Sequence, residues 1–510
     1  MTTTDRFTII WERFFLISGN IVFIIAFFIL LTASEQEPAK AANLFLFAVD
    51  LLILLFLCIG YLLFSKKQIG NLKHPLLLIA GGYLMLFILQ CIYVRLTYFY
   101  TGWDVSLMQT RVEAVISGHS LQDVSGDVGY SIYPNNLTLF YMQYLISKVG
   151  ELFSWERPYD LCIYVSCFCV AASCFLGSLT VRKIIDNGFM HFLYTLISTV
   201  YILFSPWIVI PYSDTYGMLF VTLGIWAVLY LERPIFKWPV LAFSALIGCQ
   251  IKPTCIFTLF AVLILYAPKF IMDFRKKWKE LCILLLSCLF FGGIGQGISP
   301  WVQHSLSFRI DPELRFPINH YIMMGLNERS SGGFDESDYF FTLSIPTYAE
   351  KKKIIKEEIE ERWNGMTTVQ KRDHFIAKYL YTFNDGTFSW AGEGAFFNYL
   401  PEHDNPLNDL YPEIFHPDGK YYVWYRNIAQ TIWLQILFGI LFLFLDLKKQ
   451  TTGKAFLVIT LCGLLTFLLL FEARARYLLL YAPTFLILSL YGYESLFAML
   501  STKVKSLTRT

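Results

Sequence analysis

The stretch WERFFLISGNIVFIIAFFILLT, residues 11–32, decides the fold of this chain. Its charges lie only at the start, and a helix of about 20 mostly apolar residues is long enough to cross a bilayer. No small-residue cleavage site follows residues 14–31, so the segment does not resemble a removable signal peptide. We therefore predict that it is a membrane-spanning helix.

The rest of the chain continues this pattern. It is 56% hydrophobic and 16% charged with a mean hydropathy of +0.51, whereas soluble domains carry about 25% charged residues. A net charge of only +2 argues against a nucleic-acid partner. The predicted fold is an all-α polytopic membrane protein with about twelve transmembrane helices. The predicted segments are 11–32, 43–64, 75–98, 158–180, 189–210, 214–231, 238–251, 254–268, 280–298, 428–446, 455–472 and 477–498.

Two of these segments, 238–251 and 254–268, are short for full crossings and could form a tilted or partly re-entrant hairpin. Residues 137–153 are amphipathic, and we place them in the membrane interface. A crossing there would reverse the side of every later loop and move the basic connection 181–185 outside.

The charges of the connections predict the orientation. Lys and Arg gather in five of them, and cytoplasmic loops are the ones enriched in these residues. With the N-terminus inside and twelve crossings, all five become cytoplasmic, as does the C-terminus. The five basic connections are 65–74, 181–185, 268–280, 446–454 and the tail 502–510. The sequence thus predicts a multi-pass protein of a bacterial cell membrane.

This topology divides the chain into five parts. Two long polar blocks then face the outer side, one with interfacial helices and one that is mostly α. The parts are three N-terminal helices in 1–98, a first outer loop in 99–157, helices four to nine in 158–298, an outer region in 299–427, and three C-terminal helices with a basic tail in 428–510.

The second outer region is expected to be folded. Thr347 to Glu350 and Thr367 to Gln370 have the spacing of capping boxes, which mark helix starts. Beyond them, residues 384–401 combine glycines with aromatic side chains and include Glu393, a candidate site residue. This segment predicts either a loop that cradles a ligand or a turn at the membrane surface.

The first outer loop supplies the candidate base. Asp104 follows Trp103 directly after a span, where a carboxylate is costly unless it is solvated, paired or used. The functional interpretation is a general base that activates a hydroxyl, and the alternative is a solvated acid at a helix end. Asp123 and Asp127 lie in the same loop, and either is an alternative base.

Cations occur at two other predicted outer turns. Lys252 precedes Pro253, which interrupts the helix between two short segments. Such a lysine either extends to the interface or faces a phosphate. The run EARARY, residues 472–477, places Glu472, Arg474 and Arg476 between the last two spans. Pairing with Glu472 is one interpretation; recognition of a phosphate by the arginine fork is the other, which we favour.

The sequence lacks the motifs of nucleotide-binding and metal-binding sites. The chain has no Walker motif, no HExxH and no His/Cys cluster with metal-ligand spacing, so we predict no metal site. The outer acids could still bind a divalent cation, although no spacing requires one. All eleven cysteines fall in hydrophobic segments, which indicates buried thiols and no disulfide-bonded ectodomain.

Together these motifs resemble the GT-C superfamily of integral membrane glycosyltransferases, of the bacterial protein-mannosyltransferase-like kind. The resemblance is carried by GWD at 102–104, YPNN at 133–136, KPT at 252–254 and EARARY at 472–477. Two helices look added at the N-terminus, because the loop follows the third span. The resemblance implies Asp104 as catalytic residue and Lys252, Arg474 and Arg476 as ligands of the donor phosphate. Further candidates for the substrate site are Trp103, Asp123, Asp127, Tyr133, Asn135, Glu393, Glu472 and Tyr477.

The implied activity is transfer of a sugar from a polyprenyl-phosphate donor, with inversion, to a cell-wall polysaccharide, a teichoic acid or a glycolipid. The partners would be this lipid-linked sugar, its acceptor and membrane lipid, with no certain cofactor. A polysaccharide polymerase or ligase using lipid pyrophosphates is an alternative. A transporter or flippase of lipid-linked sugars is another, but it predicts charges deep within several spans and an internal repeat, whereas the charges here lie at helix ends.

Overall fold

The computed structural model describes residues 3–33, 40–64, 75–97, 99, 101–125, 129–390, 392 and 406–507. Within these ranges the chain is all-α, without strands. Helices satisfy every backbone donor and acceptor within one segment, which a lipid environment demands. The predicted all-α polytopic fold is confirmed.

Ten helical segments in the described part of the chain are long and apolar enough to cross a membrane. The apolar stretch Gly188–Leu203, which comprises α9 (Gly188–Ile197) and η2 (Ser198–Leu203), and the helix α10 (Ser213–Tyr230) account for the other two predicted segments. The ten contain α1 (Thr3–Thr32), α2 (Asn43–Phe64), α3 (Pro75–Thr97), α8 (Asp160–Ile184), α11 (Pro234–Ile251), α12 (Phe257–Met272), α13 (Phe274–Ser305), α19 (Tyr422–Ile440), α20 (Thr451–Leu470) and α21 (Ala482–Leu507).

The hairpin around Lys252 is longer than the sequence predicted. α11 begins at Pro234, and the second arm runs from Pro253 to Met272 through the short η4 (Pro253–Ile256). The arms have 18 and 20 residues, so neither is too short to cross. Lys252 itself is extended, with a φ of −142°, because Pro253 cannot continue the hydrogen bonding of α11.

The centre of the bundle is formed by α20 and α21, the most buried of the apolar segments. α2 and α3 lie at the periphery, with side chains such as Phe56 (72% exposed) and Leu77 (70% exposed) on their outward faces. α19 crosses α21 where Gly439 meets Gly492, and small residues permit this close approach of two backbones.

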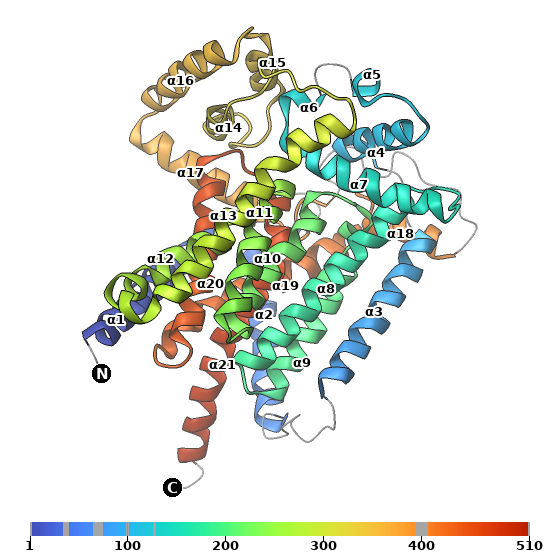
Figure 1. Cartoon of the computed structure of the whole chain (residues 1–510). Coiled ribbons are helices and arrows are strands. Elements are labelled where there is room, and N and C mark those ends of the chain that lie inside the picture. Colours follow the sequence, from blue (N-terminus) through green and yellow to red (C-terminus); the bar gives the residue numbers. More distant parts are fainter. Residues whose placement is uncertain are drawn as a thin grey trace.

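One end of the bundle is covered by a set of helices from both polar blocks, here called the cap layer (Figure 1). Both chain termini lie toward the opposite end (Figure 1). α7 is not among the ten spanning candidates of the described residues, and its interfacial place stays a prediction. The cap layer comprises α4 (Trp103–Ile116), α5 (Leu121–Ser125), α6 (Gly129–Ile132), α7 (Asn135–Leu152), α14 (Ile318–Gly325), α15 (Glu336–Ser344), α16 (Tyr348–Gly365) and α17 (Thr368–Phe383); α18 (Pro406–Phe415) packs beside α3 and α19.

Two helix starts in the cap layer follow the predicted pattern. The Thr347 hydroxyl accepts a hydrogen bond from the amide of Glu350 at the start of α16. The Thr367 hydroxyl accepts from the Gln370 amide, and the Gln370 side chain accepts from the Thr367 amide, which completes a capping box for α17. Both predictions are confirmed.

Residues 384–390 are not a surface loop. Gly386 packs so closely on α19 that a Cβ atom there would lie 2.4 Å from the Ala429 carbonyl oxygen. The Tyr201 hydroxyl and the Trp207 indole donate to the carbonyls of Gly386 and Thr387. Protein therefore fills this part of the predicted ligand cradle, whereas residues 393–401, with Glu393, lie outside the described residues.

Candidate functional site

Asp104 lies in the first turn of α4, where the helix dipole favours a carboxylate, and it is exposed to solvent. The preceding residue, Trp103, has a φ of +68°, in the left-handed region that bulky residues rarely adopt. Its ring packs on Tyr212 at a centroid distance of 5.2 Å and lies 4.6 Å from the Arg476 guanidinium. Backbone strain of this kind persists only where neighbouring contacts enforce it.

Tyr212 connects the predicted base to the predicted cations. It precedes α10, and its hydroxyl donates to Asp104 Oδ2 at 3.2 Å. Its ring lies 5.3 Å from the Arg476 guanidinium carbon. The structure thus brings Asp104 and Arg476 to one tyrosine, Asp104 at its hydroxyl and Arg476 over its ring, although they are far apart in sequence.

A buried ion cluster lies beside this tyrosine. Asp214, in the first turn of α10, forms an ion pair with Lys252 Nζ at 2.7 Å through one oxygen, and its other oxygen accepts a hydrogen bond from Arg476 Nη1 at 3.0 Å. The three side chains are 2%, 10% and 5% exposed, respectively. We call Asp214, Lys252 and Arg476 the Asp214 cluster.

The formal charge of the Asp214 cluster is +1, since two cations share one carboxylate. Burying charge is costly unless it is compensated, and an anion beside a cluster of this composition compensates its net charge. Tyr477 covers the cations: its ring centroid lies 3.9 Å from Lys252 Nζ and 5.4 Å from the Arg476 guanidinium. Such cation–π contacts stabilise both cations without neutralising them.

Arg474 has a different environment from Arg476. Its Nε donates to Glu472 Oε1 at 2.7 Å, and its guanidinium lies 5.4 Å from the Phe334 ring. Arg474 is extended, with φ −149° and ψ 137°, so Glu472 and Arg474 project from the same side of the segment. The pairing with Glu472 expected as an alternative is therefore present for Arg474, whereas Arg476 pairs with Asp214.

Tyr133, directly after α6 in the cap layer, is another predicted site residue. It is half-buried against Phe316, with ring centroids 5.7 Å apart. Burial raises the pKa of its hydroxyl, and the negative charges of Glu472 and Asp104 raise that pKa further.

Two other predicted site residues, Asn135 and Asp123, are not drawn into this group. Asn135 is exposed, and its amide donates to the neighbouring Asn136. Asp123 is exposed on α5, where the Ser120 hydroxyl accepts from its amide; among the described residues no hydrogen bond or ion pair joins it to the Asp214 cluster. Asp127 lies outside the described residues.

Sequence reasoning missed Asp214 and Tyr212. Both belong to VIPYSD, a short polar turn between two apolar helices that was placed on the outer side only as a connection. An Asp in such a turn is typical of a helix start. The sequence did contain one signal for Asp214: its turn was predicted to lie on the same side of the membrane as Lys252 and Arg476.

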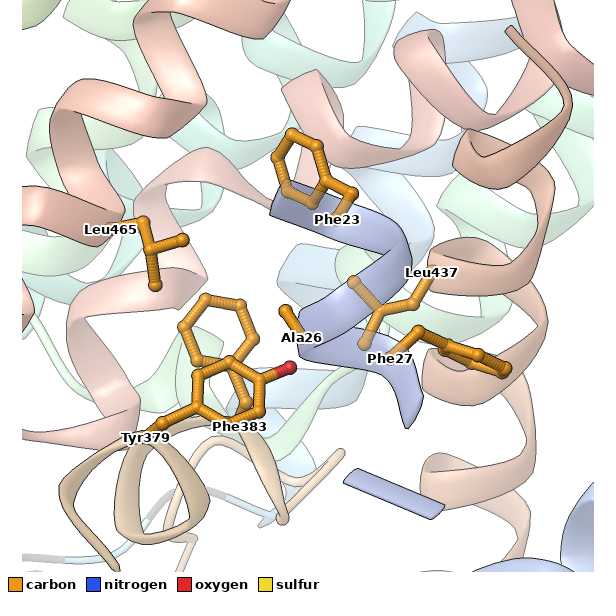
Figure 2. A pocket seen from close by; sticks show the side chains of 7 residues that line it. All are labelled: Phe23, Ala26, Phe27, Tyr379, Phe383, Leu437 and Leu465. Atoms are coloured by element: carbon orange, nitrogen blue, oxygen red, sulfur yellow. The ribbon is translucent and has the colours of Figure 1, made fainter. Parts of the chain in front are cut away.

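The residues that meet here are carboxylates, aromatic side chains, a lysine and arginines. Across the described ranges, no group of three or more His, Cys, Asp or Glu side chains could hold a metal ion. A separate small pocket lies elsewhere, between α1, α17, α19 and α20, and its lining is almost wholly apolar (Figure 2). Its size and chemistry suit packing, so the charged group is the better candidate site.

The fold and this charged end define a multi-pass integral membrane protein. Residues 2–496 match the family described as conserved hypothetical integral membrane protein, and the chain belongs to that family. The comparisons with curated proteins and with solved structures found no match.

Proposed function

We propose that this protein is a membrane glycosyltransferase that moves a sugar from a polyprenyl-phosphate donor to an extracytoplasmic acceptor. The observation that carries the proposal is that Tyr212 contacts both charged groups, Asp104 by a hydrogen bond from its hydroxyl and Arg476 over its ring. An exposed carboxylate and a buried cationic cluster thereby contact the same tyrosine at the end of a membrane bundle. A reaction with a hydroxyl nucleophile and an anionic lipid leaving group needs these two features together.

In this reaction Asp104 accepts the proton of the acceptor hydroxyl. The acceptor oxygen forms a bond to the anomeric carbon of the donor sugar, and the bond from that carbon to the phosphate oxygen breaks. The bonding electrons leave with the polyprenyl phosphate, whose increasing negative charge is stabilised by Arg476 and Lys252. A single displacement of this kind inverts the anomeric configuration.

The Asp214 cluster can stabilise the negative charge that develops on the leaving phosphate. The cluster keeps a formal charge of +1, and Asp214 holds both cations in fixed positions. A preorganised cation needs little rearrangement as the transition state forms, which makes it more effective than a mobile one. Arg474 adds a second guanidinium, which is held by Glu472.

The loop charges support an extracytoplasmic position for the site. The basic connections would lie in the cytoplasm together with both termini, and the cap layer would lie outside a bacterial cell membrane. The cap layer would then cover the site and select the acceptor. Plausible acceptors are a cell-wall polysaccharide, a teichoic acid or a glycolipid.

The direct test is sugar transfer by the purified protein in liposomes. A labelled polyprenyl-phosphate sugar is supplied with candidate acceptors, and the product is separated from the donor. Labelled product with the wild type, and none with Asp104→Asn, is the expected outcome. Transfer only from polyprenyl-pyrophosphate donors would favour a polymerase or ligase. Movement of donor across the bilayer without any product would favour a flippase.

A further inference from the structure

We infer that Asp50 is a proton-binding site inside the membrane, separate from the candidate site described above. Its carboxyl group carries a proton and donates it to the side-chain amide of Gln435. Asp50 is the eighth residue of α2, and Gln435 lies on α19. The contacts that define this proton site lie within the bundle, so it is independent of the proposed function.

Asp50 is completely buried among spanning helices. Its exposed fraction is 0%, and α2 packs against both α19 and α21. One of its carboxylate oxygens, Oδ2, is buried and has no hydrogen-bond partner among the described residues. An ionised carboxylate in such a place needs a cation or several hydrogen-bond donors to offset the loss of water.

The three helices offer no cation to Asp50. α2 contains no lysine or arginine. On α19 the residue of this kind closest to Gln435 is Arg426, nine residues away, and on α21 the one closest to Tyr493 is Lys503, ten residues away. These separations are about 14 and 15 Å along a helix that rises 1.5 Å per residue. A negative charge on Asp50 would therefore have no compensating charge beside it.

The hydrogen bonds of Tyr493 determine which end of the Gln435 side chain faces Asp50. The Tyr493 hydroxyl donates its proton to the main-chain carbonyl of Gln435 at 2.7 Å. The side-chain amide nitrogen of Gln435 donates to the same hydroxyl oxygen at 2.6 Å. The amide oxygen then points away from Tyr493 and lies 3.0 Å from Oδ1 of Asp50. Two oxygens at this distance repel each other unless a proton lies between them.

The opposite orientation of the amide group fails at Tyr493. With nitrogen and oxygen exchanged, the amide nitrogen would donate to Oδ1 of an ionised Asp50. The Tyr493 hydroxyl would then face two acceptor oxygens of Gln435, at 2.6 and 2.7 Å, with one proton to donate. The charge of Asp50 would also stay uncompensated. A protonated Asp50 satisfies all three contacts at once.

The proton makes Asp50 a donor that joins three helices. The chain of hydrogen bonds runs from Asp50 on α2 through Gln435 on α19 to Tyr493 on α21. A buried polar network strengthens the packing only when its members are satisfied. Loss of the proton would place a negative charge against the amide oxygen, so the protonation of Asp50 is linked to the packing of α2 on the bundle.

The test is the infrared spectrum of the full chain in nanodiscs at neutral pH. The C=O stretch of a protonated carboxyl group lies at higher wavenumber than the amide and carboxylate bands. The spectrum of the wild type minus that of Asp50→Asn should contain this band, with the intensity of one carboxyl group per chain. Gln435→Met should move the band, because the O–H of Asp50 then loses its acceptor.

The matched control is Glu12→Gln. Glu12 is another buried acid of a spanning helix, but Lys269 Nζ lies 3.0 Å from its Oε1 and the Thr452 hydroxyl donates to the same oxygen. Because a cation compensates its charge, the wild type minus Glu12→Gln should show carboxylate bands and no band of a protonated carboxyl group.

Unfolding temperatures in detergent test the same assignment independently. Asp50→Asn offers Gln435 an N–H donor in place of the O–H and should unfold close to the wild-type temperature. Asp50→Leu leaves the amide oxygen buried without a donor and should unfold at a clearly lower temperature.

A difference spectrum between the wild type and Asp50→Asn that contains only carboxylate bands would overturn the inference. If Asp50→Asn does not fold, the comparison between the wild type and Gln435→Met decides in its place. A protonated-carboxyl band that moves supports the proton on Asp50, and spectra without such a movement contradict it.

Discussion

The Tyr212 hydroxyl donates to the Asp104 carboxylate at 3.2 Å, and this contact joins the start of α4 to the start of α10. This hydrogen bond fixes one carboxylate oxygen of Asp104, whose side chain is otherwise exposed at the cap layer. Asp104→Asn keeps the shape of the side chain and removes its basicity. We expect sugar transfer to fall about 10²- to 10⁴-fold, the usual contribution of a general base.

Two controls accompany that variant. Glu113→Gln neutralises another exposed acid of α4 and should leave the rate unchanged. Asp123→Asn tests the alternative base and should also retain activity. Initial rates with labelled donor measure all three, and the thermal unfolding of each verifies that it is folded. Full activity in Asp104→Asn would exclude Asp104 as the base.

The second prediction concerns the stability of the Asp214 cluster. Asp214→Asn leaves Lys252 and Arg476 buried with no carboxylate between them. Removal of one partner from a buried ion pair costs about 3–5 kcal/mol, so we expect a clearly lower unfolding temperature in detergent. Glu232→Gln breaks the exposed pair of Glu232 with Lys183 and should leave that temperature unchanged. Equal temperatures for Asp214→Asn and the wild type would contradict the electrostatic account.

The third prediction assigns Arg474 to the donor. Charge-assisted hydrogen bonds contribute about 1.5–3 kcal/mol, so Arg474→Ala should weaken polyprenyl-phosphate binding by about tenfold or more. Arg474→Lys should restore only part of the affinity, because lysine lacks the planar fork. Arg329→Ala removes an exposed arginine of the cap layer that pairs with Asp335, and it serves as the control. Unchanged affinity in Arg474→Ala would limit Arg474 to its pairing with Glu472.

Much of the fold was predictable because lipid imposes length and hydropathy on each helix. All twelve predicted segments are helical, and several bounds, such as 43–64, agree with the structure. The ends of α11 and α12 were harder to predict. Arg233 and Lys269 lie near these ends and lower the local hydropathy, so the predicted segment 238–251 began too late and the predicted segment 254–268 ended too early.

The site was predictable in part. Loop charges placed Asp104 and Arg476 on one side, and the structure joins them through Tyr212. The partner of Arg476 was not predictable, because Asp214 and Arg476 meet only after α10 packs on the segment before α21. Asp50 occurs within an apolar segment, and only tertiary packing reveals that it faces Gln435.

The fourth prediction is a pH dependence of the cap layer. His320 is buried on α14, its Nδ1 lies 2.8 Å from the Thr342 hydroxyl oxygen, and burial lowers its pKa to about 4. The unfolded histidine, with a pKa of about 6.5, binds a proton between these values while the folded one does not. Stability is therefore lost as the pH falls from about 6.5 toward 4, by about 2 kcal/mol at pH 5.

Hydrogen exchange of peptides from α14 and α15, compared at about pH 7.5 and pH 5 after correction for the intrinsic rate, measures this loss. The charge of Asp338 opposes the lowering of the His320 pKa, and the charge of Arg362 adds to it. Both residues are unchanged in the variants below. His320→Gln should reduce the pH dependence, with a remainder from His374, whose pKa burial also lowers. His304→Gln, at an exposed position on α13, should behave like the wild type. Equal protection at both pH values would contradict the prediction.

The fifth prediction tests the crossing of α19 and α21, which holds the C-terminal helices together. A Cβ atom at Gly492 would lie 1.9 Å from the Gly439 carbonyl oxygen, and a backbone atom cannot move without shifting α19. Alanine elsewhere in a helix is favoured over glycine by about 0.5–1 kcal/mol. Here we expect Gly492→Ala instead to lower stability by about 1–3 kcal/mol, the usual cost of overpacking. Gly81→Ala, on α3 with no atom within 4 Å of the added Cβ, is the matched control and should not lower the unfolding temperature. If both variants unfold at the wild-type temperature in detergent, the two helices do not cross as closely as the structure indicates.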